Sequence, residues 1–353
     1  MVVKNEAPRI RTTLESARGT VDSWVVLDTG STDGTVGIVD QFLCENGGGP
    51  GLFIVDKFAG YAPARNHAFK LHEENPNPAC WTLTLSSDET LHGGDALRSF
   101  LASYTGPETA FNVELHTEGA TCLSARVRHT GSDWWYEGAV HEQLVDRVAQ
   151  RDATSLPTIP GVYIEHHATD PERRLRRMRD FDVPALTREI DDPATEPARR
   201  AQSVALLAQT YDALAAAGGE RSAHDAVLAL GYYGWRAEMG GDEGQVEFAR
   251  LHFLDVANRI GLYEWEEMNR RLGGFLAKYP RRPEAHLMLA AHTARRNVSA
   301  AMDSAMAAAQ VAADVKGKPA QGMPVDPSCE WKAWQLVAEC ARALGDVGRM
   351  REA

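Results

Sequence analysis

The chain has few cysteines, and their positions suggest no structural role for them. They are dispersed over 353 residues, with no CxxC pair and no histidine at a short spacing. This odd, scattered set argues against a disulfide framework and against a zinc site, and it fits reduced thiols. We therefore expect a cytoplasmic protein. The five residues are Cys44, Cys80, Cys122, Cys329 and Cys340.

Long apolar segments and an excess of positive charge are also missing. No run of about 18 apolar residues is present, and the N-terminal residues lack the pattern of a signal peptide. Acidic side chains outnumber basic ones by 49 to 37, which gives a net charge of −12. Proteins that bind nucleic acid or anionic membranes normally have the opposite balance. We expect no nucleic-acid partner and no transmembrane segment.

The composition present is that of a globular protein, with 44% hydrophobic and 24% charged residues. The length exceeds one usual core, so two domains are predicted, over residues 1–170 and 171–353. In the first, apolar runs of strand length alternate with helical stretches. This order predicts an α/β domain with a doubly wound, mostly parallel sheet. Strands are expected at 1–3, 24–27, 52–55, 81–85, 110–114, 125–128, 142–145 and 162–165, and helices at 7–17, 35–43 and 62–74.

The second domain is predicted to be all helical. A region rich in alanine, leucine and arginine follows residue 170, and Gly-Gly, proline or polar breaks divide it into helices. Helix pairs of this length with alanine at crossing points resemble tetratricopeptide-type repeats, and a generic helical bundle is the alternative. The expected helices span 201–217, 223–239, 247–260, 265–279, 283–295 and 300–315.

Polar residues follow the apolar runs, at the edge where open α/β sheets bind their ligands. The turn at 28–35 (DTGSTDGT) has two glycines and several small hydroxyl residues, which let backbone approach a ligand closely. Asp33 is placed to cap the next helix. Residues 86–89 (SSDE) end in two carboxylates, which suit a divalent cation bridging a diphosphate. A capped turn without a ligand is the alternative for each.

Taken together, the segments 1–7 (MVVKNEA), 28–35, 65–66 (RN) and 85–91 resemble glycosyltransferase family 2 over about the first 170 residues. The resemblance implies a GT-A fold and transfer of a sugar from a nucleotide diphosphate donor with inversion. It places Asp28 against the base and Arg65 near the nucleotide. The nucleotide-sugar-binding candidates are Lys4, Asn5, Glu6, Asp28, Gly30, Ser31, Asp33, Arg65, Asn66, Ser86 and Ser87.

The same resemblance implies a metal site. The Asp-x-Asp motif of the family falls on residues 86–88, where Ser86 replaces the first aspartate and Asp88 keeps the position of the direct metal ligand. A histidine after the last strand, His166, would complete the site and would favour Mn²⁺ over Mg²⁺. The missing carboxylate predicts weaker metal binding or a different way of binding the donor ribose.

The segment 134–142 (WWYEGAVHE) resembles the acceptor side of the family. An inverting transfer needs a base that takes the proton of the acceptor, and Glu142 is predicted to be that base, with His141 beside it. The alternative is a His-Glu pair that only holds the fold. The arginines at 173–179 either steer anions or form a solvated helix face.

The helical half, notably 232–236 (YYGWR) and 279–284 (YPRRPE), resembles bacterial and phage glycosyltransferases that modify peptides or proteins. A protein or peptide acceptor is therefore the first hypothesis, with hexose or N-acetylhexosamine from a UDP-sugar and a homodimer through the helices. A lipid-linked or polysaccharide acceptor is the second. A non-catalytic sugar-nucleotide-binding scaffold is the third, and Ser86 is its main support.

Overall fold

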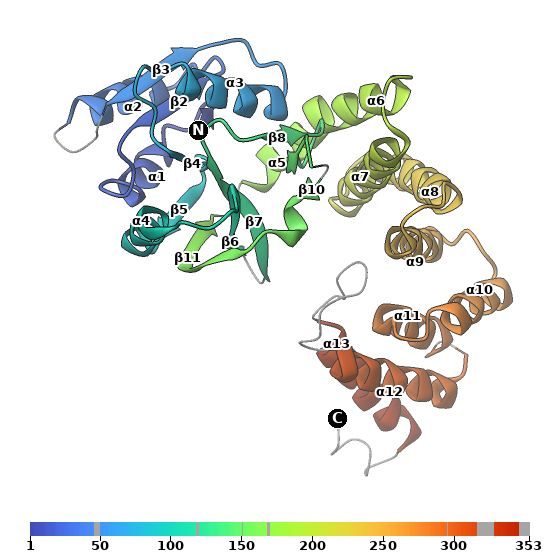
Figure 1. Cartoon of the computed structure of the whole chain (residues 1–353). Helices are drawn as coiled ribbons and strands as arrows, with labels where there is room; N and C mark the ends of the chain where they lie inside the picture. The colour runs from blue at the N-terminus through green and yellow to red at the C-terminus, as the bar shows by residue number, and fades with distance from the viewer. Residues whose placement is uncertain are drawn as a thin grey trace. The chain divides into compact units, whose positions relative to one another are not determined.

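A computed structural model describes residues 1–45, 50–117, 120–149, 151–167, 170–294, 296–315 and 328–345. The chain divides into two compact units, Met1–Arg177 and Met178–Ala353. The first contains the strands and the second contains helices (Figure 1). An α/β domain followed by a helical region is thus confirmed.

The first unit opens with three parallel strands in the order β1 (Val2–Val3), β2 (Trp24–Asp28), β3 (Gly51–Val55). Apolar runs bounded by turns form these strands, and the helices between them are α1 (Ile10–Ser16) and α2 (Thr35–Cys44). Helix α3 (Tyr61–Glu73) follows β3. The register aligns Val3 with Asp28 and Asp28 with Val55. All three carboxyl ends therefore meet at one edge, as predicted.

The rest of the sheet structure differs from the prediction. A second sheet has the order β4-β7-β6-β11-β5, and in it only β6 and β11 run parallel. The expectation of a mostly parallel sheet therefore holds only for β1–β3. Only two residues separate β6 from β7, and so short a connection requires antiparallel pairing. The strands are β4 (Trp81–Leu83), β5 (Glu89–His92), β6 (Ala110–Thr117), β7 (Ala120–His129) and β11 (Thr158–His166).

Smaller elements complete this unit. A three-stranded antiparallel sheet contains β8 (Trp134–Glu137), β9 (Gln143–Asp146) and β10 (Arg151–Asp152), followed by a short 3-10 turn, η1 (Ala153–Ser155). Helix α4 (Gly94–Ser103) follows β5, and helix α5 (Pro171–Arg177) follows β11. Strands β5, β8 and β10 and helix α4 were not predicted.

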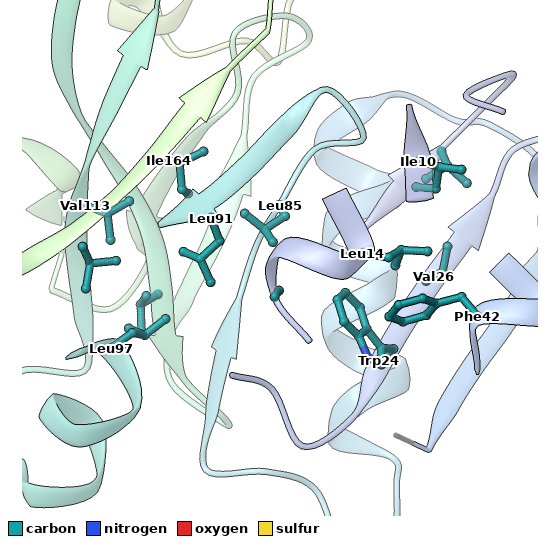
Figure 2. Close-up of a cluster of buried hydrophobic side chains, with 14 of the residues drawn as sticks. Ile10, Leu14, Trp24, Val26, Phe42, Leu85, Leu91, Leu97, Val113 and Ile164 are labelled. Atoms are coloured by element: carbon teal, nitrogen blue, oxygen red, sulfur yellow. The ribbon is translucent and has the colours of Figure 1, made fainter. Parts of the chain in front are cut away.

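One hydrophobic core joins the sheet of β1–β3 to the five-stranded sheet. Trp24 and Phe42 meet edge to face at 5.5 Å beside Leu14, and the cluster continues through Val113 and Ile164 of the second sheet (Figure 2). Each fully buried side chain of this size contributes about 1.5–3 kcal/mol. This shared core fixes the loops at the carboxyl ends of β1 and β2 relative to the loop that follows β4.

The second unit is formed by successive helices, several of which pack through alanines, for example Ala301 and Ala305 against Ala341. Its predicted helices are present with slightly shifted bounds, and no described helix is long and apolar enough to cross a membrane. The helices α6 and α13 and the π-helical turn η2 were not predicted. The elements are η2 (Met178–Asp182), α6 (Val183–Asp191), α7 (Pro197–Ala216), α8 (Ser222–Glu238), α9 (Glu243–Arg259), α10 (Trp265–Lys278), α11 (Pro283–Ala294), α12 (Val298–Val315) and α13 (Cys329–Leu344).

Candidate functional site

The loops that follow β1 and β2 are held together by hydrogen bonds between side chains and backbone. Asn5 has a left-handed backbone (φ 56°), its N–H donates to Ser31 Oγ at 2.8 Å, and its Oδ1 accepts from the N–H of Thr32 at 2.8 Å. Glu6 N–H donates to Thr35 Oγ1 at 2.7 Å. These bonds bring the predicted binding residues of the two loops side by side.

Asp33 links the same two loops, but the prediction that it caps helix α2 is wrong, because Gly34 is the N-cap residue and no side chain caps the helix. Its Oδ2 accepts from the N–H of Ala7 at 3.1 Å, and its Oδ1 accepts from the N–H and hydroxyl of Thr35. Burial alone would raise the pKa of Asp33, but the bonds from Thr35 and Ala7 outweigh it and lower that pKa. These bonds tie the loop after β1 to the loop after β2.

Asp28, at the end of β2, has one carboxylate oxygen engaged and the other free of protein partners. Its side chain is buried, with 1% exposure. Oδ1 accepts from the N–H groups of Gly30 and Ser31 at 2.9 and 2.8 Å. No described residue donates a hydrogen bond to Oδ2. A buried oxygen without a donor is costly, so Oδ2 keeps an unused capacity to accept a hydrogen bond.

The segment after β4 places Asp88 against the last strand. His166 Nε2, at the end of β11, lies 3.4 Å from Asp88 Oδ2. The hydrogen bond with Asp88 raises the pKa of His166. Burial would raise the pKa of Asp88, but His166 lowers it. The sequence placed both residues in one metal site, and the structure brings them together.

The other members of this segment are used inside the protein. Ser86 N–H donates to Glu89 Oε2 at 2.7 Å, and the Ser87 carbonyl accepts from the hydroxyl of Thr13 at 2.9 Å. Glu89 is buried, and its Oε1 accepts from Arg126 Nη2 at 2.6 Å. Glu89 is therefore a structural carboxylate, which leaves Asp88 as the metal candidate of the segment.

A metal fits this pair only as a partial site. Among the described residues, no group of three or more histidine, cysteine, aspartate or glutamate side chains could hold a metal ion. Asp88 and His166 offer one carboxylate and one imidazole, a donor set that Mn²⁺ accepts. Divalent cations at phosphate sites are often held by one or two protein groups together with substrate phosphates. The pair therefore suits a cation that arrives with a diphosphate.

Arg65 and Glu142 form a nearly buried ion pair. Arg65, near the start of α3, places Nε 2.6 Å from Glu142 Oε1, in the loop between β8 and β9. The Arg65 guanidinium also lies over the ring of Tyr136, 5.1 Å from its centre. Burial would lower the pKa of Arg65, but the charge of Glu142 raises it. The predicted base is thus held by the predicted nucleotide-binding arginine.

Asn66 and His141 flank this pair with different roles. The Asn66 amide donates to the carbonyl of Tyr136 and accepts from its N–H, both at 2.8 Å. Its side chain thereby joins α3 to β8, which is a fold-holding role that the nucleotide-binding prediction did not anticipate. His141 is exposed and has a left-handed backbone (φ 52°).

These observations place a polar site at the carboxyl edge of the first sheet. Residues 1–122 match the family model described as glycosyl transferase family 2. Over these residues the chain is similar to glycosyl transferase family 2. Glu142 and His166 lie beyond the matched residues.

No curated protein matches the chain. Among solved structures, BtubC (BKLC) from P. vanneervenii is 14% identical, covers 51% of this chain and 70% of its own, and has a TM-score of 0.38. Mannosyltransferase PcManGT from Pyrobaculum calidifontis, described as in complex with GDP-Man and Mn²⁺, is 18% identical. It covers 72% of this chain and 85% of its own, with a TM-score of 0.37.

Two arginines near the site were not singled out by the sequence. Arg9 Nε lies 3.5 Å from Glu6 Oε2, and its charge contributes to lowering the pKa of Asp88. Arg126 holds Glu89. The available signal was a charged residue in an otherwise apolar context, at the start of α1 and inside β7. Arg173, left open between anion steering and a solvated face, also contacts Glu6.

A cavity of about 900 Å³ lies within the same unit, lined in part by Val25, Trp81, Leu83 and Leu101. Arg65 is the only predicted site residue on its wall, and Asp28, Asp88 and Glu142 are not part of it. Apart from Arg65, the predicted site residues therefore lie at the sheet edge and outside this cavity.

Proposed function

We propose that this chain is a glycosyltransferase that moves a sugar from a nucleoside diphosphate to an acceptor with inversion at the anomeric carbon. The observation that carries the proposal is the match of residues 1–122 to glycosyl transferase family 2. The buried, unpartnered Oδ2 of Asp28 in the matched segment supports it, because it is an acceptor held ready for a ligand.

Donor binding uses the two interlocked loops. Asp28 Oδ2 accepts a hydrogen bond from the base or ribose, and the glycine backbone at Gly30 (φ 98°) leaves room for close approach. Lys4, Asn5 and Ser31 line the same edge. A UDP-sugar that carries a hexose or N-acetylhexosamine is the proposed donor, and GDP-mannose is the alternative.

Metal dependence is the next part of the proposal. Asp88 and His166 would hold a divalent cation, Mn²⁺ before Mg²⁺, together with the diphosphate of the donor. When bound, the cation supplies positive charge that stabilises the leaving diphosphate. The loss of an aspartate at Ser86 is compatible with this because Asp88 keeps its partner, His166.

Glu142 is the proposed general base. It takes the proton of the acceptor while the acceptor atom bonds to the anomeric carbon, and the bond from that carbon to the phosphate oxygen breaks with its electron pair on the diphosphate. Arg65 fixes the position of Glu142 through their ion pair. His141 lies next to the base on an exposed turn.

The acceptor proposed first is a protein or peptide side chain, presented along a tetratricopeptide-like helical unit, in a cytoplasmic protein that forms a homodimer through its helices. Extended faces of stacked helices are suited to polypeptide partners. A lipid-linked or polysaccharide acceptor is second. A non-catalytic sugar-nucleotide binder is the competing class. It is favoured by the ion pair with Arg65, which engages the carboxylate of Glu142 that the transfer would need as a base.

The test is a nucleotide-release assay over a panel of UDP- and GDP-sugars with MnCl₂, MgCl₂ or a chelator. We expect release from one donor, dependent on metal, and lost in Asp88→Ala. Glu142→Gln should retain nucleotide binding and abolish transfer, because it keeps the shape of the side chain and removes the base. If nucleotide binds but no donor is ever turned over, in the presence of peptide and lipid-linked acceptors alike, the chain is a binder and not a transferase.

A further inference from the structure

Helix α5 carries an arginine that is tied to a carboxylate of the donor loop. Arg173 Nη2 lies 2.5 Å from Glu6 Oε1 and 3.2 Å from the carbonyl oxygen of Lys4, and its Nη1 lies 3.3 Å from Glu6 Oε2. The guanidinium thus spans both oxygens of one carboxylate, which is the geometry with which arginine also binds phosphate.

The side chains of Glu6 and Arg173 differ in their exposure to solvent. The side chain of Glu6 is 11% exposed, whereas that of Arg173 is 37% exposed. Glu6 also has Arg9 within 3.5 Å, so its charge stays partly compensated without Arg173. Arg173 can therefore leave Glu6 at a smaller cost than a pair with no third member would impose.

The charges of Glu6 and Asp88 both act on Arg173. The hydrogen bond with Glu6 raises the pKa of Arg173, and the charge of Asp88 contributes in the same direction. Arg173 therefore lies within the field of the candidate metal ligand. A diphosphate brought to this edge would meet several carboxylates and needs cations besides the metal. The carboxylates are Glu6, Asp28, Asp33 and Asp88.

We propose that Arg173 is a donor-binding residue that exchanges the carboxylate of Glu6 for the diphosphate of the nucleotide donor. Without donor, Arg173 pairs with Glu6, and with donor bound it contacts the diphosphate. This proposal rests on the proposed function, since it concerns the same donor. It assigns the basic helix α5 to the donor diphosphate, whereas Arg65 is committed to Glu142.

The exchange is tested by titration calorimetry with UDP and GDP, and with UMP and GMP, each in MnCl₂. Arg173→Gln should weaken binding of the diphosphate about tenfold to a hundredfold, the range for loss of a charged hydrogen bond, and should affect the monophosphate much less. Arg173→Lys keeps the charge without the fork and should lie between.

Arg176→Gln is the matched control, because it removes the same charge from the same helix. Arg176 is 62% exposed and pairs only with Asp170 and Glu172 among the contacts described. We expect it to bind both nucleotides like the wild type. Thermal unfolding of each variant separates lost binding from lost folding.

Glu6→Gln distinguishes exchange from simple anchoring. If Glu6 competes with the diphosphate, this variant binds UDP or GDP at least as tightly as the wild type. Weakening equal to that of Arg173→Gln would overturn the exchange, and so would equal losses of mono- and diphosphate in Arg173→Gln. If the wild type binds neither nucleotide, the proposed function fails as well, so the two failures are distinguishable.

Discussion

Asp28 and Asp33 lie in one loop, and the same chemical change at each should have opposite effects. Asp28→Asn retains an oxygen at the Oδ1 position, where Gly30 and Ser31 donate, and puts an NH₂ group at the Oδ2 position. The buried charge disappears and no described protein bond is lost. We therefore expect the free energy of unfolding to stay the same or to rise.

Nucleotide binding should fall in the same variant. The ligand loses one hydrogen bond to a charged acceptor and meets a donor instead, which costs about 1.5–3 kcal/mol, or roughly tenfold to 150-fold in affinity. Titration calorimetry with UDP and GDP, alongside their nucleosides, measures this loss. It should persist with the nucleoside, because Asp28 is assigned to base or ribose. An unchanged affinity in folded Asp28→Asn would refute the assignment of Oδ2 to a ligand.

Asp33→Asn is the matched control. Both oxygens of Asp33 already accept from protein, from Thr35 and Ala7, and an amide can satisfy only one of these positions. Because the side chain is exposed, we expect a loss of stability of at most about 1 kcal/mol. Its lowered pKa makes this contribution present above the unfolded pKa and lost as the pH falls through the folded value.

Three further predictions concern the support of the fold. Glu89→Gln should destabilise the protein by about 3–5 kcal/mol in chemical denaturation, because it leaves Arg126 buried without its counter-charge, and the loss should shrink when Arg126→Met is already present. Asn66→Ala should lower the melting temperature through two lost backbone bonds, about 1–3 kcal/mol in all, with nucleotide affinity of the folded protein unchanged; weaker binding would restore Asn66 as a ligand residue. Burial would raise the pKa of Asp212, but hydrogen bonds, including one from Arg259, lower it, so Asp212→Asn should cost stability at pH 7 and match the wild type below the folded pKa in acid unfolding.

The parallel part of the fold was predictable because its signals are local. The run at Trp24–Asp28 is apolar and bounded by turn residues, and the helices around it have the 3.6-residue period. Strand β5 (Glu89–His92) was missed since its first residue is a glutamate, and only the pairing of that glutamate with Arg126 on β7 allows it to be buried. Pairing between distant strands leaves no local pattern.

The sequence indicated which residues lie at the sheet edge, but it did not indicate which side chains contact one another. The end of a strand indicated Asp28 and Asp88, and the structure places Asp28 at the edge where β1–β3 end and Asp88 against His166. The spacing of residues along the sequence does not predict which side chain each of them contacts. Arg65 and Glu142 are 77 positions apart and form one ion pair. Arg173 and Glu6 are 167 positions apart.

The crossed hydrogen bonds between the loops after β1 and β2 have a consequence for binding entropy. Asn5, Glu6 and Asp33 fix the backbone of both loops before any donor arrives, so little conformational freedom remains there to be lost. The base end of the donor should therefore meet a preorganised surface that barely changes shape. The rearrangement on binding would then be confined to the diphosphate end, where Arg173 changes partners. The conformational entropy lost on binding would come mainly from that one side chain.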